Sequence, residues 1–527
     1  MMSRLRGCSA IASPKSEYGV VRLSPADRLA LQHDVQTHMM RLSHHSDAHD
    51  THHCPARPPR ISCVYGKLNK EARKGDMRLL IRNASYVIRD ARRVERDADV
   101  LIEGDRIVAV GQMAVADTPD LYTLDGAGLA VIPGLVNAHT HLYQNFLKGL
   151  RDDVGLVEWC NTTLYPMAYA IHRGHWIEHD ETCGYHWAIL SGLEMLRGGV
   201  TCCVDMNMNM DSVFGGWGEI GIRGIGAVAV ADRWLPGPLR KDPDATRAEA
   251  LRLATTWHGA HPRLDVVLGP STPFLCSRDL LLWTRDRAAE LGIGVQIHLA
   301  ETRYEVAQVL AETGLTPVAY AHSLGLLGPR TTAVHCVHVT DAEIDLLAET
   351  GTTVVHCPKS NLKLGSGIAP IPKMLKRGVT VALAADGAAS NDTLDMFEEM
   401  RFAALLHKGV NEDPTIITAR QAFEMATAGG ARAAGTDAGT IDPGRLADLA
   451  LIRLDRPHLQ PFHDPINTLV YCAKASDVDA TIIGGEIVVW GGIVQTVNEA
   501  AARRAAQTYG AQLYERGVAL WQEVSPS

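Results

Sequence analysis

The sequence predicts an α/β protein in which a (β/α)8 barrel forms the middle of the chain and one small sheet domain is built from both ends. Two observations predict this fold. Between residues 131 and 430, short apolar strands alternate with helical stretches. Strand-rich segments with turns at Asn, Asp and Gly come before and after this region. A doubly wound sheet fits the same alternation of strands and helices.

The composition is that of a globular protein that has neither a basic net charge nor an apolar run long enough to span a membrane. The 527 residues are 46% hydrophobic and 21% charged, with a net charge of −9 and a pI of about 6.2. This acidic balance predicts no nucleic-acid partner, and no apolar run reaches the ~18–20 residues of a membrane helix. Eleven cysteines are scattered without a CxxC pair, which fits a reducing cytoplasm. We therefore expect a cytoplasmic protein.

Residues 1–76 differ from the rest of the chain. They contain seven of the 23 histidines, including the tract HHSDAHDTHHC at 44–54, and few apolar alternations. This composition predicts a disordered extension, or a true start at Met77. Loose metal binding is the alternative interpretation of a His- and Cys-rich tract.

The sheet domain is predicted by two pairs of strand-rich segments. MRLLIRNASYVIRD (77–90) and ADVLIEGDRIVAVGQ (98–112) alternate apolar and polar residues. ADLALIRLD (447–455) and ATIIGGEIVVWGGIVQTV (480–497) repeat this pattern near the C-terminus, and a surface helix is expected from Asn498 to Glu523. The predicted divisions are the extension (1–76), the first part of the sheet domain (77–130), the barrel (131–435), and the second part with the C-terminal helix (436–527).

The barrel is predicted by repeated apolar strands, with helices such as 341–349 and 394–406 between or after them. The strand candidates are VTCCVDM (200–206), IRGIGAVAV (222–230), LDVVLGP (264–270), GVQIHLAE (294–301), TAVHCVHV (332–339), TTVVHCP (352–358) and VTVALAADG (379–387).

Histidines and carboxylates follow these strands directly. In VIPGLVNAHTHLYQ, His139 and His141 are two residues apart and therefore share one face of a strand. His298 ends the apolar run GVQI, His335 ends TTAV, and Asp386 ends VTVALAA. The C-terminal strand ends form the mouth of a barrel, where such side chains converge. Imidazoles with one carboxylate suit zinc or a similar first-row ion, with a position left for water.

Four segments, taken in order, resemble the amidohydrolase superfamily, in its branch of triazine and nucleobase-type deaminases and chlorohydrolases. They are PGLVNAHTHLYQ, HLAE, AVHCVHVTDAEIDLLAETGTTVVHCPKSNLKLGSGIAPI and ALAADGAASNDTLDMFEEMR. With the flanking strands, the resemblance covers residues 77–499. It implies a distorted TIM barrel with a small β-sandwich domain formed from both chain ends. It also implies one metal, because this branch needs no carbamylated lysine.

The resemblance assigns roles to these residues. It implies that His139, His141, His298 and Asp386 bind one divalent ion, with Zn²⁺ expected and Fe²⁺ as the alternative. Glu301, which ends HLAE, would carry a proton from the activated water to the leaving group or a ring nitrogen. His335 would hydrogen-bond the water or the developing alkoxide, so the catalytic residues are Glu301, His335 and Asp386.

The substrate pocket is predicted less directly. GSGIAPI and DGAASNDTLDMFEEMR resemble methylthioadenosine/S-adenosylhomocysteine deaminases, which usually have a His in GPHxPY and a Glu after LxP. Here Ser271 in GPSTPF and Ala168 in LYPMA stand in those places, so the ribose hydroxyls would lack two partners. Other segments resemble 8-oxoguanine deaminase and hydroxyatrazine ethylaminohydrolase. The pocket candidates are therefore Gln144, Trp159, Ser271 and Phe274, although the two aromatic residues also suit a core.

The expected function is hydrolytic deamination of an amino-substituted nitrogen heterocycle, such as a purine, pterin or triazine. The alternatives are hydrolysis of carbamate or urea-type C–N bonds or of ring C–Cl bonds, and deamination of adenosine thioethers. A non-catalytic binding relative is a further alternative, but such relatives typically lose ligands that this chain retains. The resemblance also implies a small-molecule substrate, a homo-oligomer and no membrane partner.

Overall fold

A computed structural model of the chain describes residues 78–116, 118–173, 182–207, 210–233 and 235–524. The N-terminal extension predicted for residues 1–76, with its histidine-rich tract, lies outside the described residues. Within these described ranges, no helix combines the length and the apolar composition needed to cross a membrane.

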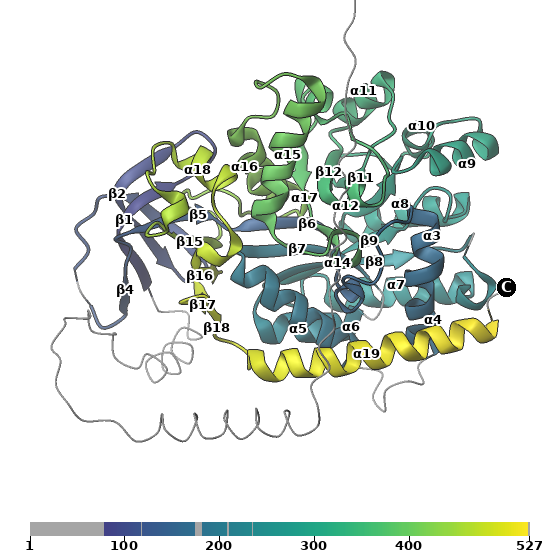
Figure 1. Ribbon diagram of the computed structural model, residues 1–527, viewed down its shortest axis with the longest axis horizontal. Coiled ribbons are helices and arrows are strands. Elements are labelled where there is room, and N and C mark those ends of the chain that lie inside the picture. Colours follow the sequence, from purple (N-terminus) through teal and green to yellow (C-terminus); the bar gives the residue numbers. More distant parts are fainter. Residues whose placement is uncertain (1–77, 117, 174–181, 208–209, 234, 525–527) are drawn as a thin grey trace, which may run out of the picture. The chain divides into compact units, whose positions relative to one another are not determined.

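Among the described residues, nine parallel strands form one sheet in the order β13-β12-β11-β10-β9-β8-β7-β6-β14 (Figure 1). Their bounds are β6 (Leu135–His141), β7 (Val200–Asn207), β8 (Arg223–Val230), β9 (Leu264–Pro270), β10 (Val295–Leu299), β11 (Thr331–His335), β12 (Thr353–His356), β13 (Val381–Leu383) and β14 (Asp386–Gly387). The short strands β13 and β14 follow each other in sequence, yet β13 pairs with β12 and β14 pairs with β6. The sheet therefore curls round so that its two ends meet in one segment, which is consistent with a TIM-like barrel.

Helices occupy the connections between these strands, as the alternation in the sequence predicts. They include η1 (Leu142–Leu147), α3 (Leu156–Trp159), α4 (Tyr165–Arg173), α5 (Thr182–Arg197), α6 (Met210–Ile220), α7 (Pro243–Trp257), α8 (Arg278–Leu291), α9 (Arg303–Thr313), α10 (Pro317–Ser323), α11 (Asp341–Thr350), α12 (Pro358–Lys363), α13 (Ile371–Lys376), α14 (Ala388–Asn391), α15 (Met396–Asn411), α16 (Ala419–Ala426) and α17 (Ala428–Ala433).

Helix ends follow from local chemistry. Thr340 and Glu343 form a capping box that starts α11, and Gly351 ends it in the left-handed conformation. The helix predicted from residue 394 begins two residues later. The reason is that the Asp395 carboxylate accepts hydrogen bonds from the N–H groups of Phe397 and Glu398 and so acts as the N-cap.

A second, mixed sheet joins strands from both ends of the described chain, in the order β18-β17-β16-β15-β5-β1-β2-β3, with β4 paired to β1. The junction is the antiparallel pair β5–β15, in which Val131 lies opposite Leu451. The strand bounds are β1 (Arg78–Ile88), β2 (Val94–Glu103), β3 (Arg106–Gly111), β4 (Leu121–Asp125), β5 (Leu129–Pro133), β15 (Leu449–Arg453), β16 (Val478–Ile483), β17 (Glu486–Trp490) and β18 (Ile493–Val494).

The two sheets are connected by a buried ion pair at the N-terminal end of β8. Arg223 donates to both carboxylate oxygens of Asp448, at 2.7 and 3.0 Å, and both side chains are almost fully buried. Asp448 immediately precedes β15, and its Oδ1 also accepts a hydrogen bond from the Gly484 N–H. The charges are thus satisfied on both sides, as buried charges must be.

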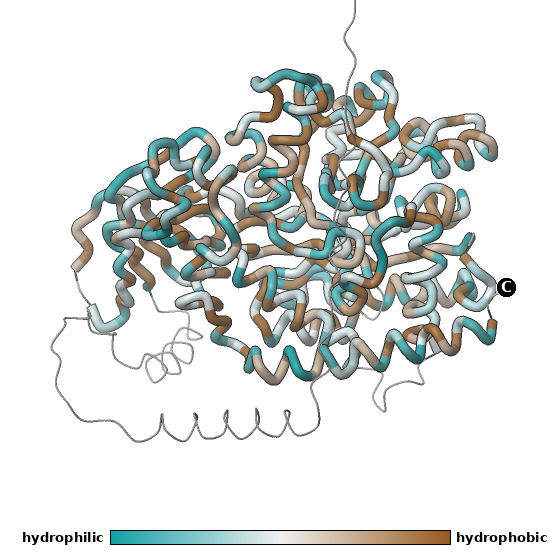
Figure 2. Tube along the Cα trace, viewed as in Figure 1, coloured by the Kyte–Doolittle hydropathy of each residue, from teal (hydrophilic) through white to brown (hydrophobic). Residues whose placement is uncertain are grey.

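Helix α19 (Glu499–Val524) ends the described chain and packs against α4 and α5 (Figure 1). Hydrophilic and hydrophobic segments alternate along it in Figure 2, as expected of a helix with one packed face. Close packing explains Gly517, because a Cβ there would lie 2.7 Å from the Pro166 carbonyl oxygen.

Candidate metal centre and its surroundings

Three imidazoles converge at the C-terminal ends of β6 and β10. The His298 Nε2 atom lies 3.2 Å from both the His139 Nε2 and the His141 Nε2. Each ring uses its other nitrogen to donate a hydrogen bond. The three acceptors are Gln296 Oε1 for His139, the Met206 carbonyl for His141 and the Ser271 carbonyl for His298, at 2.7–2.8 Å.

These hydrogen bonds fix the tautomers of the rings. A backbone carbonyl only accepts, and Gln296 presents its oxygen because its Nε2 donates to the Ala138 carbonyl. The protons therefore lie on Nδ1, and three Nε2 lone pairs point at one another. A cation between them removes the repulsion that this arrangement otherwise has.

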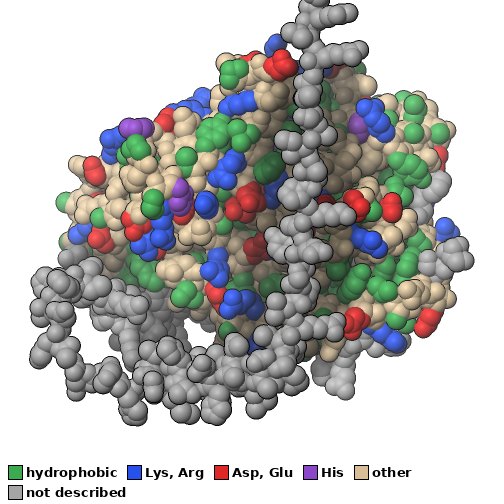
Figure 3. All heavy atoms as spheres, in the orientation of Figure 1, with side chains coloured by type: hydrophobic (Ala, Val, Ile, Leu, Met, Phe, Trp, Pro, Cys, Tyr) green, Lys and Arg blue, Asp and Glu red, His purple; other side chains and the backbone are tan. Residues whose placement is uncertain are grey.

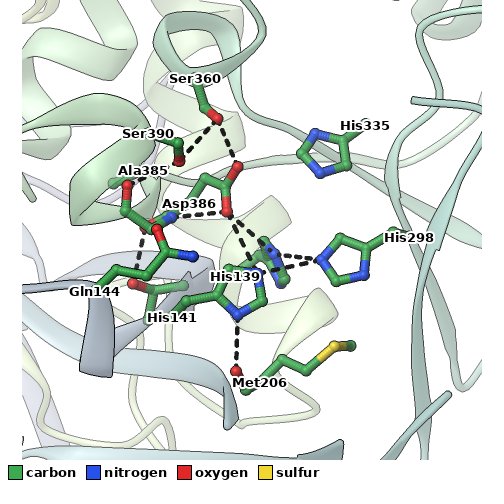
Figure 4. A network of polar contacts seen from close by, with 12 residues as sticks. His139, His141, Gln144, Met206, His298, His335, Ser360, Ala385, Asp386 and Ser390 are labelled. Carbon is green, nitrogen blue, oxygen red and sulfur yellow. Dashed lines mark hydrogen bonds and ion pairs between the residues drawn. The ribbon is translucent and has the colours of Figure 1, made fainter. Parts of the chain in front are cut away.

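The carboxylate of Asp386 completes the group (Figure 4). Its Oδ1 lies 3.5 Å from the Nε2 of His139 and 3.6 Å from that of His141. Tetrahedral zinc with Zn–N distances of about 2.0–2.1 Å separates its ligand atoms by roughly 3.3–3.4 Å. The donor set and these four separations therefore fit one ion of this kind, which can expand its coordination to take up water. The Ser360 hydroxyl donates to the other oxygen, Oδ2, at 2.6 Å and holds the carboxylate in this orientation.

Burial keeps the imidazoles neutral. Burial, together with the neighbouring histidines, lowers the pKa of His141 to about 4 and that of His298 well below its ordinary value. Since a neutral imidazole is the form that binds metal, the site is prepared for an ion at neutral pH.

Glu301 and His335 lie beside this group. The His335 Nε2 is 3.5 Å from Glu301 Oε2, and its Nδ1 donates to Asn361 Oδ1 at 2.9 Å. Glu301 Oε1 accepts a hydrogen bond of 3.1 Å from the Ser366 hydroxyl. Burial raises the pKa of Glu301, and the nearby His335 opposes this shift.

The backbone is strained where these side chains leave their strands. Ala300, His335, Cys336 and Asp386 all have φ between +47° and +72°, a region that non-glycine residues rarely adopt. Such strain costs of order 1–3 kcal/mol per residue and persists where a function requires it.

Glu305 holds the strained turn that presents Glu301. Its two carboxylate oxygens accept the N–H groups of Ala300 and Glu301 at 2.9 and 2.8 Å. Burial raises the pKa of Glu305 to about 8. Sequence analysis missed this residue, together with Gln296, Ser360, Asn361 and Ser366. The only signal was that the last three lie inside the segment HCPKSNLKLGS, which carries the resemblance.

Two of the predicted substrate residues have buried polar atoms without a partner. Gln144 Oε1 and Trp159 Nε1 have no hydrogen bond within the described part of the chain. The Gln144 amide lies directly against the backbone beside Asp386, because a Cβ on Gly387 would come within 1.7 Å of it. An unpaired buried polar atom at such a place calls for a ligand.

The other two predicted substrate residues are placed differently. Ser271 contributes its carbonyl oxygen, which orients His298, and its hydroxyl forms no hydrogen bond with the described residues. Phe274 is half-buried and packs edge-on against Tyr304, with ring centroids 6.2 Å apart.

A cavity of about 430 Å³ lies next to the proton-transfer pair. Its lining includes Ser366, which donates to Glu301, and Thr302, which follows Glu301 in sequence. Glu158, Arg303 and His338 add polar groups to a wall that also contains leucine, valine and tyrosine side chains. A volume of this size suits a small molecule.

Comparison with known proteins gives consistent matches. A sequence model described as "Amidohydrolase family" matches residues 130–488. The chain is 41% identical to the 5'-deoxyadenosine deaminase of Methanothermobacter thermautotrophicus over 79% of its own length and 95% of the relative. It is equally identical to the 5-methylthioadenosine/S-adenosylhomocysteine deaminase of Desulforudis audaxviator, over 83% of this chain and 100% of that protein.

Solved structures agree with these matches. A zinc-bound adenosine deaminase from Xanthomonas campestris superposes with a TM-score of 0.77 at 33% identity, covering 82% of this chain and 98% of that chain. A zinc complex of atrazine chlorohydrolase from Arthrobacter aurescens has the same TM-score at 25% identity, covering 82% and 100%.

Proposed function

Because the chain belongs to the amidohydrolase family, we propose that it catalyses hydrolytic deamination of the adenine ring in an adenosine-type nucleoside. Within the expected class of amino-substituted heterocycles, this choice is supported by relatives named as deaminases of such nucleosides. In the reaction, water forms a C–O bond at the ring carbon that bears the amino group. The C–N bond breaks and ammonia leaves with a proton taken from the water.

We propose that His139, His141, His298 and Asp386 hold one divalent ion. The observation that carries this proposal is the convergence of three unprotonated Nε2 atoms, two of which also face one carboxylate oxygen of Asp386. Nitrogen and carboxylate ligands in this arrangement favour zinc, with Fe²⁺ as the alternative. When bound, such an ion supplies a nucleophile at neutral pH by lowering the pKa of water.

Proton transfer is assigned to Glu301 and His335. Glu301 in its ionised form accepts a proton from the attacking water and delivers it to a ring nitrogen or to the departing amine. Its burial raises the pKa and makes it a stronger base than an exposed carboxylate. His335, which donates through Nδ1 to Asn361, presents its unprotonated Nε2 as a hydrogen-bond acceptor for the attacking water.

Recognition of the ring is assigned to Gln144 and Trp159, whose unpaired buried atoms await a partner, with Ser271 and Phe274 at the edge. The cavity beside Glu301 has room for a substituent carried by the ring. Ala168 packs with Tyr169 and Leu239 in an apolar cluster and offers the ribose no polar group. The two residues in which this chain departs from its relatives therefore leave the ribose contacts open. Because the ribose contacts stay open, aminotriazines and chlorotriazines remain the second candidate substrates.

The remaining expectations stand as proposals. We propose the divisions 1–76, 77–130, 131–435 and 436–527, with the curled sheet as a distorted (β/α)8 barrel and the mixed sheet as one β-sandwich domain. The pairing of β14 with β6 and of β5 with β15 supports them.

The cysteines with described side chains are free thiols, in keeping with a cytoplasmic protein. A homo-oligomer is also proposed, on the resemblance alone.

The test is ammonia release by metal-analysed protein with a panel of adenosine, 5'-deoxyadenosine, adenosine thioethers, free amino-purines, pterins and triazines. Glu301→Gln is the inactive control, and Glu312→Gln, on the exposed side of α9, is the matched control. We expect the highest kcat/KM with an adenosine derivative. Turnover of triazines or free bases without adenosine turnover contradicts the nucleoside assignment, and a wild-type level in Glu301→Gln contradicts the proton path.

A further inference from the structure

A second group of metal-binding side chains lies on the other side of Asp386. Ligand atoms of His335, Cys357 and Asp386 are within 4.8 Å of one another, and all three residues are buried. Glu301 adjoins them, with its Oε2 atom 3.5 Å from His335 Nε2. Three potential ligands of different chemistry therefore lie together next to the proposed metal, and Glu301 contacts one of them, His335.

Cys357 belongs to the inner face of the curled sheet. It packs with Ala138, Val334, Val355 and Ala382 beneath the strand ends. Within the described chain, no hydrogen-bond partner is found for its Sγ. The thiol has no role in the proposed deamination, and sequence analysis gave it none.

The free electron pairs of this group are available. His335 donates through Nδ1 to Asn361, so its Nε2 lone pair faces Glu301. Asp386 directs Oδ1 towards His139 and His141 and receives the Ser360 hydroxyl at Oδ2. A carboxylate between two ligand groups can bridge two ions, which in two-metal sites lie about 3.5–4 Å apart.

We propose that His335, Cys357, Asp386 and Glu301 form a second, inhibitory site for a thiophilic divalent cation. The proposal rests on the first metal site, since Asp386 is shared. Contraction of the group by about an ångström brings the ligand atoms to the roughly 3.3–3.6 Å separations of a tetrahedral ion with nitrogen, oxygen and sulfur ligands. On binding, the Sγ–H bond breaks, the proton goes to solvent and an Sγ–metal bond forms without any change of oxidation state.

Inhibition follows from the identity of the ligands. A cation here occupies the Nε2 of His335 and the carboxylate of Glu301, which are the two groups that must move protons. Soft sulfur favours Zn²⁺ or Cd²⁺, whereas Mg²⁺ prefers six oxygen ligands and has no matching site here. Excess zinc should therefore inhibit the enzyme, and excess magnesium should not.

The experiment starts from full-length protein loaded with one equivalent of zinc and adds Zn²⁺, Cd²⁺ or Mg²⁺. Bound metal per chain, the initial rate and the ultraviolet absorption of a cadmium thiolate are measured together. We expect a second equivalent of Zn²⁺ or Cd²⁺ to bind, the rate to fall at least about tenfold, and the cadmium thiolate absorption to appear.

Variants assign the effect to the thiol. Cys357→Ser should weaken the second binding step by at least about tenfold, since even outer-shell partners of a metal contribute 10–100-fold, and should abolish the cadmium thiolate absorption. Cys276→Ser, at another buried cysteine whose thiol contacts the Val230 carbonyl, should behave like wild type. The absorption of the wild-type protein needs no variant and so remains informative if Cys357→Ser does not fold.

The outcomes separate this inference from the proposed function. One bound metal at every zinc and cadmium concentration, with an unchanged rate, overturns the second site and leaves the deaminase intact. A cadmium thiolate absorption that persists in Cys357→Ser also overturns it. A chain that binds no metal at all overturns the proposed function itself.

Discussion

The two ends of the parallel strands show opposite ways of placing polar groups in a protein interior. At the N-terminal end of β8, Arg223 and Asp448 form two hydrogen bonds with each other, and the Pro262 carbonyl and the Gly484 N–H satisfy them further. At the C-terminal ends, three imidazole lone pairs face one another, and Gln144 Oε1 has no hydrogen-bond partner among the described residues. The polar groups at the first end are satisfied within the protein, whereas those at the second end are left open for a ligand.

This difference shows where stability and function reside. A buried pair that is fully satisfied contributes to joining two sheets, whereas left-handed backbone at Ala300, His335 and Asp386 costs stability. Changes at the C-terminal ends should therefore alter chemistry more than stability, and changes at the N-terminal ends should do the reverse. The surface is a third region to compare with these two ends. Acidic and basic side chains lie interspersed on the face shown in Figure 3.

The largest expected effect is loss of a ligand at the C-terminal ends. His298→Ala should lose the bound metal and lower kcat/KM by on the order of 10⁴-fold or more, because several kcal/mol of transition-state stabilisation disappear. Metal analysis and ammonia release measure both effects, with circular dichroism to verify folding. Full activity in a metal-free, folded variant would contradict the role of these ligands.

The next effect concerns proton transfer. Glu301→Gln should retain the metal and lower kcat by about 10²–10⁴-fold. In the wild type, activity requires ionised Glu301. Activity is therefore present above the raised pKa of this carboxyl and is lost as the pH falls through that pKa. The acid limb of the rate–pH profile should lie at a higher pH than the 4.5 of an ordinary glutamate. Rate–pH profiles test this prediction. An acid limb that survives unchanged in Glu301→Gln belongs to another group.

The third effect belongs to the N-terminal ends. Arg223→Met should lower the free energy of unfolding by about 3–5 kcal/mol, because it leaves the Asp448 carboxylate buried without its cation. The kcat of the folded fraction should remain near wild type. Denaturant unfolding at low temperature measures the loss. The double variant Arg223→Met/Asp448→Leu should recover much of it, and no recovery would show that the ion pair is not its cause.

The smallest effect is expected at the surface. Lys373 and Asp341 form a 2.9 Å ion pair with side chains 62% and 59% exposed. Lys373→Ala should change the free energy of unfolding by no more than about 1 kcal/mol and leave activity unchanged. Thermal unfolding at two salt concentrations measures it. A loss as large as that of Arg223→Met would remove the distinction between buried and exposed pairs.

Much of the candidate metal centre could be predicted from the sequence. Period-two alternation and the residues that end each apolar run indicated that His139, His141, His298, His335 and Asp386 lie at strand ends, and the structure brings them together. Strand ends are predictable because the apolar run stops where the strand leaves the core.

The partners of those residues could not be predicted. Gln296 on β10, and Ser360 and Asn361 on α12, meet their histidines and carboxylate through side-chain hydrogen bonds between elements that are remote in sequence. Local propensity also argues against left-handed Ala300 and Asp386, which tertiary contacts impose. The preference against adenosine thioethers rested on Ser271 and Ala168, which lack the polar side chains that the resemblance implies at these positions. The Ser271 carbonyl orients His298 and Ala168 packs in an apolar cluster, so this preference stays a prediction.

In both sheets, a strand early in the described chain pairs with a strand that follows much later, and this affects how the chain folds. Thr140 pairs with Asp386 and Pro133 with Leu449, positions 246 and 316 residues apart. During synthesis at about 5–20 residues per second, β5 and β6 therefore emerge many seconds before the strands that complete their sheets. Until then their edges remain open to other chains. Folding of this protein should consequently be slow and sensitive to aggregation, and yield on refolding should fall steeply with protein concentration.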